Sequence, residues 1–138
     1  MVTNTPLVLV VDDEFYLCHA LSRILEKEGY RVITAPDGET ALKFTEEERP
    51  DVILLDLLMP GIGGREVCRR VRQFSMVTQI IYFTAEVMPT DPLKLKELRR
   101  EADAFIAKPA TSQQILSKVN GRLQGAHLDQ QRVTKQSL

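Results

Sequence analysis

The sequence predicts an α/β fold, a single domain built on a doubly wound parallel sheet of five strands. Short apolar runs rich in β-branched residues alternate with segments of helical periodicity along the 138 residues. Several of these runs are apolar on both faces, which is typical of central strands that helices cover on both sides. A strand followed repeatedly by a helix predicts βαβ units with right-handed crossovers.

Five runs are predicted as strands because each is short and apolar and ends at polar or turn residues. They cover residues 7–11, 30–35, 51–55, 79–83 and 103–107. Helices are predicted at residues 14–28, 37–48, 64–73, 91–101 and 111–123. Asp37 is expected to cap the second helix, and Thr111 or Ser112 the fifth. The first helix has an apolar stripe of Phe15, Cys18, Leu21 and Leu25.

The domain is expected to cover residues 1–124, and residues 125–138 are expected to be a polar tail or linker. The helical pattern decays after Leu123 and is interrupted by Gly121 and Gly125. Glycine lowers helix stability by about 1 kcal/mol relative to alanine. The last helix is therefore expected to fray near this point.

Composition and charge exclude several classes of function. A net charge of -1 gives no global field that attracts nucleic acid or an anionic membrane, so neither direct nucleic-acid binding nor membrane insertion is expected. The first residues lack the basic segment of a secretory signal, and no apolar stretch approaches a membrane span. Cys18 and Cys68 show no metal-ligand spacing and are expected to be free thiols. These features predict a cytoplasmic protein.

Reactive side chains follow four of the five predicted strands. Asp12 and Asp13 follow the first strand, Asp56 the third, Thr84 the fourth and Lys108 the fifth. Ligands of open α/β sheets bind beyond the carboxyl ends of the strands. Three carboxylates, one hydroxyl and one ammonium are therefore expected to meet at one edge of the sheet.

Four motifs surround these residues. They are DD at residues 12–13, D-x-x-M-P-G-x-x-G at 56–64, T-A at 84–85 and A-D-A-F-I-A-K-P at 102–109. With these motifs, the chain from about residue 7 to residue 123 resembles the receiver domain of response regulators in bacterial two-component systems. The resemblance implies a chemotaxis-type, flavodoxin-like (βα)5 fold with strand order 2-1-3-4-5.

The resemblance also implies a metal site for Mg²⁺ or Mn²⁺. Asp13, Asp56 and the backbone carbonyl of Leu58 would bind the ion directly, and Asp12 would act largely through water. This set fits the ion, because magnesium takes hard oxygen ligands in octahedral geometry and keeps several waters. Clustered carboxylates would be costly without a cation, since unit charges at 4 Å interact by about 4 kcal/mol at a dielectric of 20.

Phosphoryl transfer is the chemistry that the resemblance implies. Asp56 would be the phosphoacceptor, and Lys108 would pair first with Asp56 and then with the phosphoryl oxygens. Thr84 would bond the phosphoryl group through its hydroxyl, and Phe105 would be an aromatic switch that changes rotamer. An aspartate can form an aspartyl phosphate, and the transfer needs in-line positioning and charge neutralisation.

The predicted function is that of a phosphoacceptor switch in a phosphorelay. A sensor histidine kinase or a phosphotransfer protein would donate the phosphoryl group, and the chain would catalyse only its own phosphorylation and dephosphorylation. It is therefore not expected to be an enzyme acting on an external substrate. The output partner or downstream domain cannot be identified from the sequence, and a phosphorylation-dependent homodimer stays open.

Two other classes of function fit the sequence less well. A hydrolytic phosphatase with an aspartyl nucleophile needs D-x-D after the first strand, whereas Asp12 and Asp13 are adjacent. A nucleotide-binding protein is suggested only by the fragment GIGGRE, in which Glu66 takes the place of the last glycine of G-x-G-x-x-G.

The chain departs from the family pattern at Glu101, where a glycine is common, and at Phe105, where many members have tyrosine. Basic residues concentrate at residues 64–72 and 93–101. Both stretches are expected to be solvated helix faces, with partner docking as the alternative for the second. The bond between Lys108 and Pro109 is a candidate cis peptide.

Overall fold

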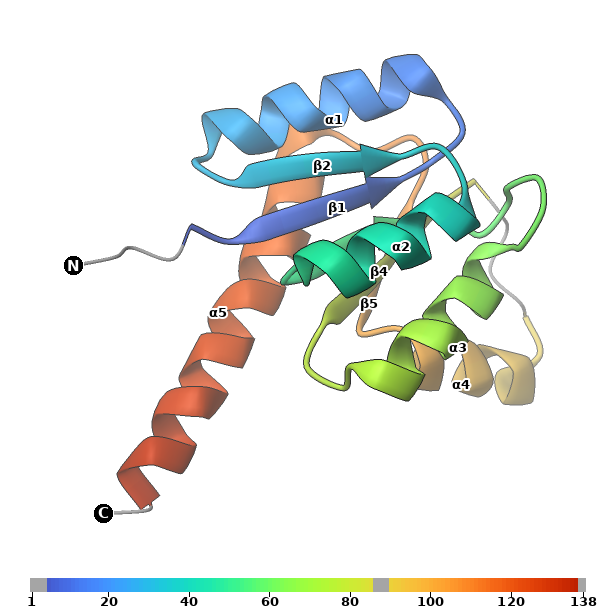
Figure 1. The fold of residues 1–138 in the computed structure, drawn as a ribbon. Helices are drawn as coiled ribbons and strands as arrows, with labels where there is room; N and C mark the ends of the chain where they lie inside the picture. The colour runs from blue at the N-terminus through green and yellow to red at the C-terminus, as the bar shows by residue number, and fades with distance from the viewer. Residues whose placement is uncertain (1–4, 86–89, 137–138) are drawn as a thin grey trace.

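A computed structural model describes residues 5–85 and 90–136, with side chains as far as Gln124. Strands and helices alternate along the described chain, and the strands form one parallel sheet in the order β2-β1-β3-β4-β5 (Figure 1). The predicted fold class and strand order are therefore confirmed. The strands are β1 (Leu7–Val11), β2 (Arg31–Ala35), β3 (Val52–Leu55), β4 (Gln79–Thr84) and β5 (Ala104–Ala107).

The helices are α1 (Phe15–Lys27), α2 (Gly38–Glu48), α3 (Gly64–Phe74), α4 (Pro92–Glu101) and α5 (Ser112–Gln136). Their starts follow from local capping. The Asp37 carboxylate accepts a hydrogen bond from the Thr40 amide at 2.7 Å, as predicted. At α5 the cap is Thr111, whose hydroxyl accepts from the Gln114 amide at 3.1 Å. Among the described residues, no helix combines the length and the apolar character needed to cross a membrane.

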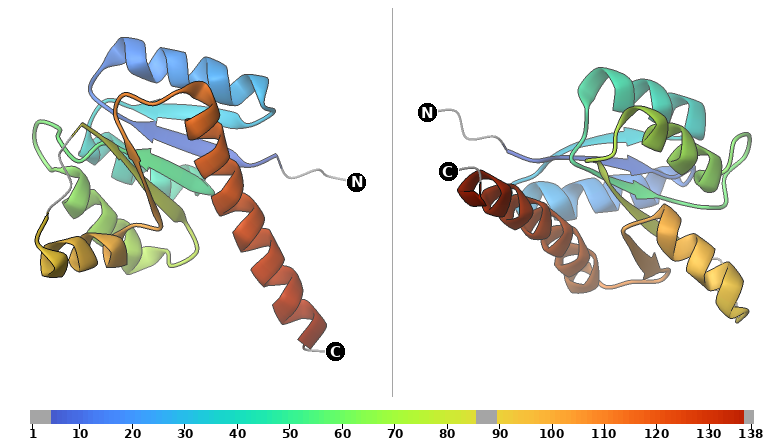
Figure 2. Two further views of the ribbon diagram at one scale, coloured as in Figure 1. Left: turned by 180° about the vertical axis from the view of Figure 1, so that it is seen from behind. Right: turned by 90° about the horizontal axis from the view of Figure 1, so that it is seen from below.

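Helices cover both faces of the sheet (Figure 2), and an apolar layer lies on each face. Leu9 and Val11 of β1 pack in the layer that contains residues of α2, α3 and α4. Val8 and Val10 pack in the layer of α1 and α5. Full burial of such a side chain stabilises the fold by about 1.5–3 kcal/mol. Strands β1 and β3 are buried on both faces. The polar residues that follow them, Asp12 and Asp56, are therefore held in place at the carboxyl edge of the sheet.

Two predictions about helices were wrong. Helix α5 continues past Leu123 to Gln136 and extends well beyond the sheet (Figure 1), because single glycines weaken a helix without ending it. Phe15 does not belong to the inner stripe of α1, since 76% of its surface is exposed and its ring contacts Tyr16 and His19 instead. The division of the chain at residue 124 stays a prediction.

Candidate functional site

The carboxyl edge of the sheet brings together the three predicted acids. Carboxylate oxygens of Asp12, Asp13 and Asp56 lie within 4.8 Å of one another. Asp12 and Asp56 are 2% and 6% exposed, whereas Asp13 is open to solvent. The three side chains, together with Lys108, are called the acidic site below. The convergence that was expected from strand order is thus present in the structure.

Short turns after β1 and β3 hold the two buried carboxylates. An oxygen of Asp12 accepts a hydrogen bond from the Glu14 amide at 2.9 Å. In the same way, Asp56 accepts one from the Leu58 amide at 3.2 Å. Such bonds to the backbone two residues onward are typical of aspartate in turns. They leave the second oxygen of each carboxylate directed to other partners.

Gly64 allows the loop after Asp56 to fold back tightly against it. A Cβ atom at this position would lie 2.4 Å from the Asp56 carbonyl oxygen and 2.9 Å from the Leu57 Cα. The Gly64 amide donates a hydrogen bond to the Leu57 carbonyl at 3.2 Å. The last glycine of the D-x-x-M-P-G-x-x-G motif is therefore one that the backbone requires.

Lys108 reaches both buried acids but lies closer to Asp12. Its Nζ is 2.6 Å from Asp12 Oδ2 and 3.4 Å from Asp56 Oδ2. Burial lowers the pKa of the ammonium, but its hydrogen bond to Asp12 and the charges of both acids outweigh this effect and raise the pKa. The main chain of Lys108 is fixed by a bond to the Thr84 carbonyl at 3.0 Å, and the Lys108-Pro109 peptide is cis.

The acidic site holds more negative than positive charge. Three carboxylates share one ammonium, although like charges at 4 Å repel by about 4 kcal/mol at an effective dielectric of 20. Oxygen atoms that are held close together, in part by the turns after β1 and β3, are what a hard divalent cation such as Mg²⁺ or Mn²⁺ binds. The residues present therefore fit the predicted ion.

A sequence profile of the response regulator receiver domain matches residues 8–120. The chain belongs to this family. Receiver domains act in two-component signalling, where response regulators receive a phosphoryl group from histidine kinases. The predicted function is confirmed at this level, and the resemblance inferred from the four motifs is correct. The role of each individual residue stays a prediction.

The transcriptional regulator PhoP of alkaline phosphatase synthesis in Bacillus subtilis is 39% identical over 121 residues. The match covers 88% of this chain and 50% of that protein, so this receiver domain spans about half the length of its relative. A CheY-like receiver domain from Methanospirillum hungatei is similar in structure, with a TM-score of 0.84 at 25% identity over 91% of this chain and 99% of that one.

A third similar protein is the response regulator TrrA from Thermotoga maritima, whose structure is a complex with Mg²⁺ and beryllofluoride. It is 33% identical and gives a TM-score of 0.76, with 86% of this chain and 99% of that chain covered. A response regulator with this fold has thus been solved in complex with magnesium and beryllofluoride.

The remaining predicted residues lie on β4, on β5 and in the turn after β3. Thr84 is buried at the end of β4, and Leu58 directs its side chain to solvent while its amide bonds to Asp56. Phe105 is half-buried on β5, and its ring meets the ring of Tyr82 edge to face, with centroids 5.4 Å apart. An edge-to-face pair of this kind contributes about 0.5–1.5 kcal/mol.

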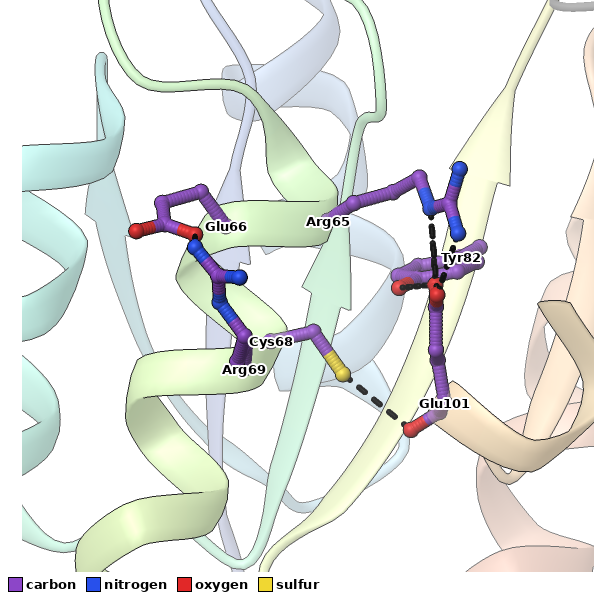
Figure 3. Close-up of polar contacts among 6 residues, drawn as sticks. All are labelled: Arg65, Glu66, Cys68, Arg69, Tyr82 and Glu101. Carbon is purple, nitrogen blue, oxygen red and sulfur yellow. Dashed lines mark hydrogen bonds and ion pairs between the residues drawn. The ribbon is translucent and has the colours of Figure 1, made fainter. Parts of the chain in front are cut away.

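Sequence reasoning missed a second polar cluster, which joins α3, β4 and α4 (Figure 3). We call Arg65, Cys68, Tyr82 and Glu101 the Glu101 cluster. Arg65 Nε and Tyr82 Oη donate to the Glu101 carboxylate at 2.9 and 3.0 Å, and the Cys68 thiol donates to its main-chain carbonyl at 3.1 Å. Burial, and then the charges nearby, raise the pKa of the Tyr82 hydroxyl far above its usual range. The only signal in the sequence was the unusual acid at position 101.

Proposed function

We propose that this receiver domain is a Mg²⁺-dependent switch in which Asp56 accepts a phosphoryl group from a sensor histidine kinase or a phosphotransfer protein. The observation that carries the proposal is the placement of Asp56. Its carboxylate is nearly buried, lies within 4.8 Å of the oxygens of Asp12 and Asp13, and has Lys108 3.4 Å away. This arrangement provides a nucleophile, cation ligands and a fixed positive charge at one point.

The transfer is a displacement at phosphorus. An Asp56 oxygen forms the new O–P bond while the P–N bond to the donor histidine breaks, and the released imidazole nitrogen takes up a proton. In dephosphorylation, water attacks the same phosphorus, the O–P bond to Asp56 breaks, and inorganic phosphate leaves with the Asp56 carboxylate restored. The domain thus acts on its own phosphoryl group, and we propose no turnover of an external substrate.

Charge neutralisation makes this displacement possible. A magnesium ion held by Asp13, Asp56 and the Leu58 carbonyl, with Asp12 acting through water, would offset the negative charge of the phosphoryl oxygens. Lys108 lies close enough to Asp56 to contribute a second positive charge. Phosphorylation would then be read out through the Thr84 hydroxyl and the position of the Phe105 ring. We place this switch in the cytoplasm, where its kinase would donate the phosphoryl group.

The test is covalent labelling followed by intact-mass measurement. The wild-type chain, incubated with acetyl phosphate and Mg²⁺, is expected to gain one phosphoryl group, and the Asp56→Ala variant none. Asp37→Asn is the matched control, because Asp37 caps α2 and takes no part in the acidic site. Labelling that persists in Asp56→Ala would overturn the assignment, as would multiple turnover of p-nitrophenyl phosphate by the wild-type chain.

A further inference from the structure

A basic groove lies between α3 and α4, on a surface that the phosphoryl chemistry does not use. Its volume is about 620 Å³, within the range of protein ligand sites. Four arginines line it, at positions 65, 69, 72 and 100. Two glutamates, at positions 66 and 101, also line it, so that positive charge exceeds negative charge.

The arginines already hold carboxylates within the chain. Arg65 donates through Nε to both oxygens of Glu101, at 3.2 and 2.9 Å, and Arg69 donates to Glu66 (Figure 3). Arg70 also donates to Glu66. A guanidinium binds a carboxylate well because its donors form a planar fork that matches the two oxygens. The groove therefore presents groups whose orientation suits carboxylates.

Positive charge is left over after these pairs form. Arg100 lines the groove, is exposed, and makes no hydrogen bond or ion pair with any residue that the structure describes. The Arg69 side chain is 71% exposed despite its bond to Glu66. Helix α4 adds the exposed cations Lys94, Lys96 and Arg99. A surface of this kind steers an oppositely charged partner during association.

Apolar surface accompanies the charge. Met76 lines the groove and is 78% exposed, and Cys68 contributes to its inner wall. Phe74 and Val77, on either side of Met76 in sequence, are exposed as well. Interfaces with high affinity combine arginines with apolar anchors, and an exposed methionine adapts readily to a partner.

We propose that the groove between α3 and α4 docks an acidic, amphipathic segment of a partner protein. Carboxylates of the segment would bind Arg100 and Arg69, and its apolar side chains would pack on Met76. Nucleic acid is the less favourable occupant, because a sugar-phosphate backbone offers no apolar side chains to pack on the exposed Met76. The docking does not require phosphorylation of Asp56 and so goes beyond the proposed function.

The experiment uses the full unphosphorylated chain and a fluorescent peptide that repeats Glu-Leu-Glu-Glu. Fluorescence anisotropy is expected to show binding that weakens about tenfold or more in Arg69→Glu/Arg100→Glu, since each charge reversal replaces attraction by repulsion. Arg23→Glu is the matched control, because Arg23 is exposed on α1, which covers the opposite face of the sheet. In the wild-type chain, amide chemical shifts of α3 and α4 are expected to change on binding.

Two control probes separate charge from apolar contact. A peptide with every Glu replaced by Gln, and one with every Leu replaced by Ser, are each expected to bind more weakly than the parent. Equal affinity of the parent peptide for the wild type and the double variant would overturn the proposal, as would no binding at all. Tighter binding of oligothymidylate, lost in the double variant, would overturn it in favour of nucleic acid.

Discussion

The acidic site and the Glu101 cluster differ in how many donors the chain supplies for each carboxylate. In the acidic site, three carboxylates share the single cation Lys108. In the Glu101 cluster, one carboxylate receives hydrogen bonds from both Arg65 and Tyr82. The two sites lie on the same sheet, with Tyr82 only two residues before Thr84 in β4.

The difference shows which charges the chain neutralises by itself. The Glu101 carboxylate is satisfied by side chains from α3 and β4, so this cluster is complete without any external group. The acidic site is incomplete, because its excess negative charge has no protein partner among the described residues. An ion that binds the acidic site of the folded chain, and not the unfolded chain, should therefore stabilise the fold. The contacts of the Glu101 cluster should not change when the ion binds.

The largest effect is expected at Gly64, where the two regions meet at the start of α3. Gly64→Ala should lower the free energy of unfolding by about 3 kcal/mol, because the new methyl group would clash with the Asp56 carbonyl and the Leu57 main chain. Gly121→Ala is the control, since its Cβ would meet nothing within 4 Å and should stabilise α5 by about 0.5–1 kcal/mol. Urea denaturation measures both. Equal effects of the two substitutions would contradict the tight approach at Gly64.

Magnesium is expected to have the next largest effect. At a concentration one hundred times its dissociation constant, an ion that binds only the folded chain adds about 2.7 kcal/mol of stability. Thermal melts with and without millimolar Mg²⁺ should show this gain in the wild type, and most of it should disappear in Asp13→Asn. Glu97→Gln, which changes an exposed acid on α4, should keep it. No shift in the wild type would count against a metal site.

A smaller effect is expected at Tyr82. Tyr82→Phe removes the hydroxyl that donates to Glu101 at 3.0 Å and should lower stability by about 1 kcal/mol near neutral pH, with the Mg²⁺ response unchanged. Because burial raises the pKa of Tyr82 above its ordinary value of 10.0, the native protein keeps this proton longer than the unfolded chain does.

The stability that Tyr82 contributes is therefore present below pH 10 and is lost as the pH rises further. The loss should approach about 1.4 kcal/mol per pH unit. Denaturation between pH 9 and pH 11 measures it. A Tyr82→Phe variant should show a shallower alkaline decline than the wild type, since its other titrating groups are the same. If the stabilities of the wild type and the variant fell equally steeply with pH, folding would not raise the pKa of Tyr82.

The acidic site could be predicted from the sequence because one rule of topology governs it. Residues that follow parallel strands meet at one edge, so Asp12, Asp56 and Lys108 were placed together by position alone. The preference of Lys108 for Asp12 over Asp56 could not be predicted. Lys108 Nζ lies 2.6 Å from Asp12 Oδ2 and 3.4 Å from Asp56 Oδ2. A difference of less than one ångström in the position of a flexible side chain cannot be derived from sequence.

The Glu101 cluster was beyond sequence reasoning for a different reason. Arg65, Tyr82 and Glu101 come from three separate elements, and no periodicity links their positions. Tyr82 reads as one more apolar residue of a buried strand until its hydroxyl is seen to need a partner. The full length of α5 could not be predicted either. A helix segment that extends beyond the sheet needs no apolar stripe, and such a stripe is the pattern by which a helix is recognised in a sequence.

The asymmetric position of Lys108 bears on the proposed role of Asp56 as the nucleophile. A carboxylate oxygen loses reactivity when a short, charge-assisted hydrogen bond draws on its lone pair. Because the ammonium is seated on Asp12 at 2.6 Å, Asp56 Oδ2 experiences its charge at 3.4 Å and keeps more of its electron density. In the proposed mechanism, the Lys108 ammonium would leave Asp56 Oδ2 without a short charge-assisted bond and would need only a small side-chain movement to reach the phosphoryl group.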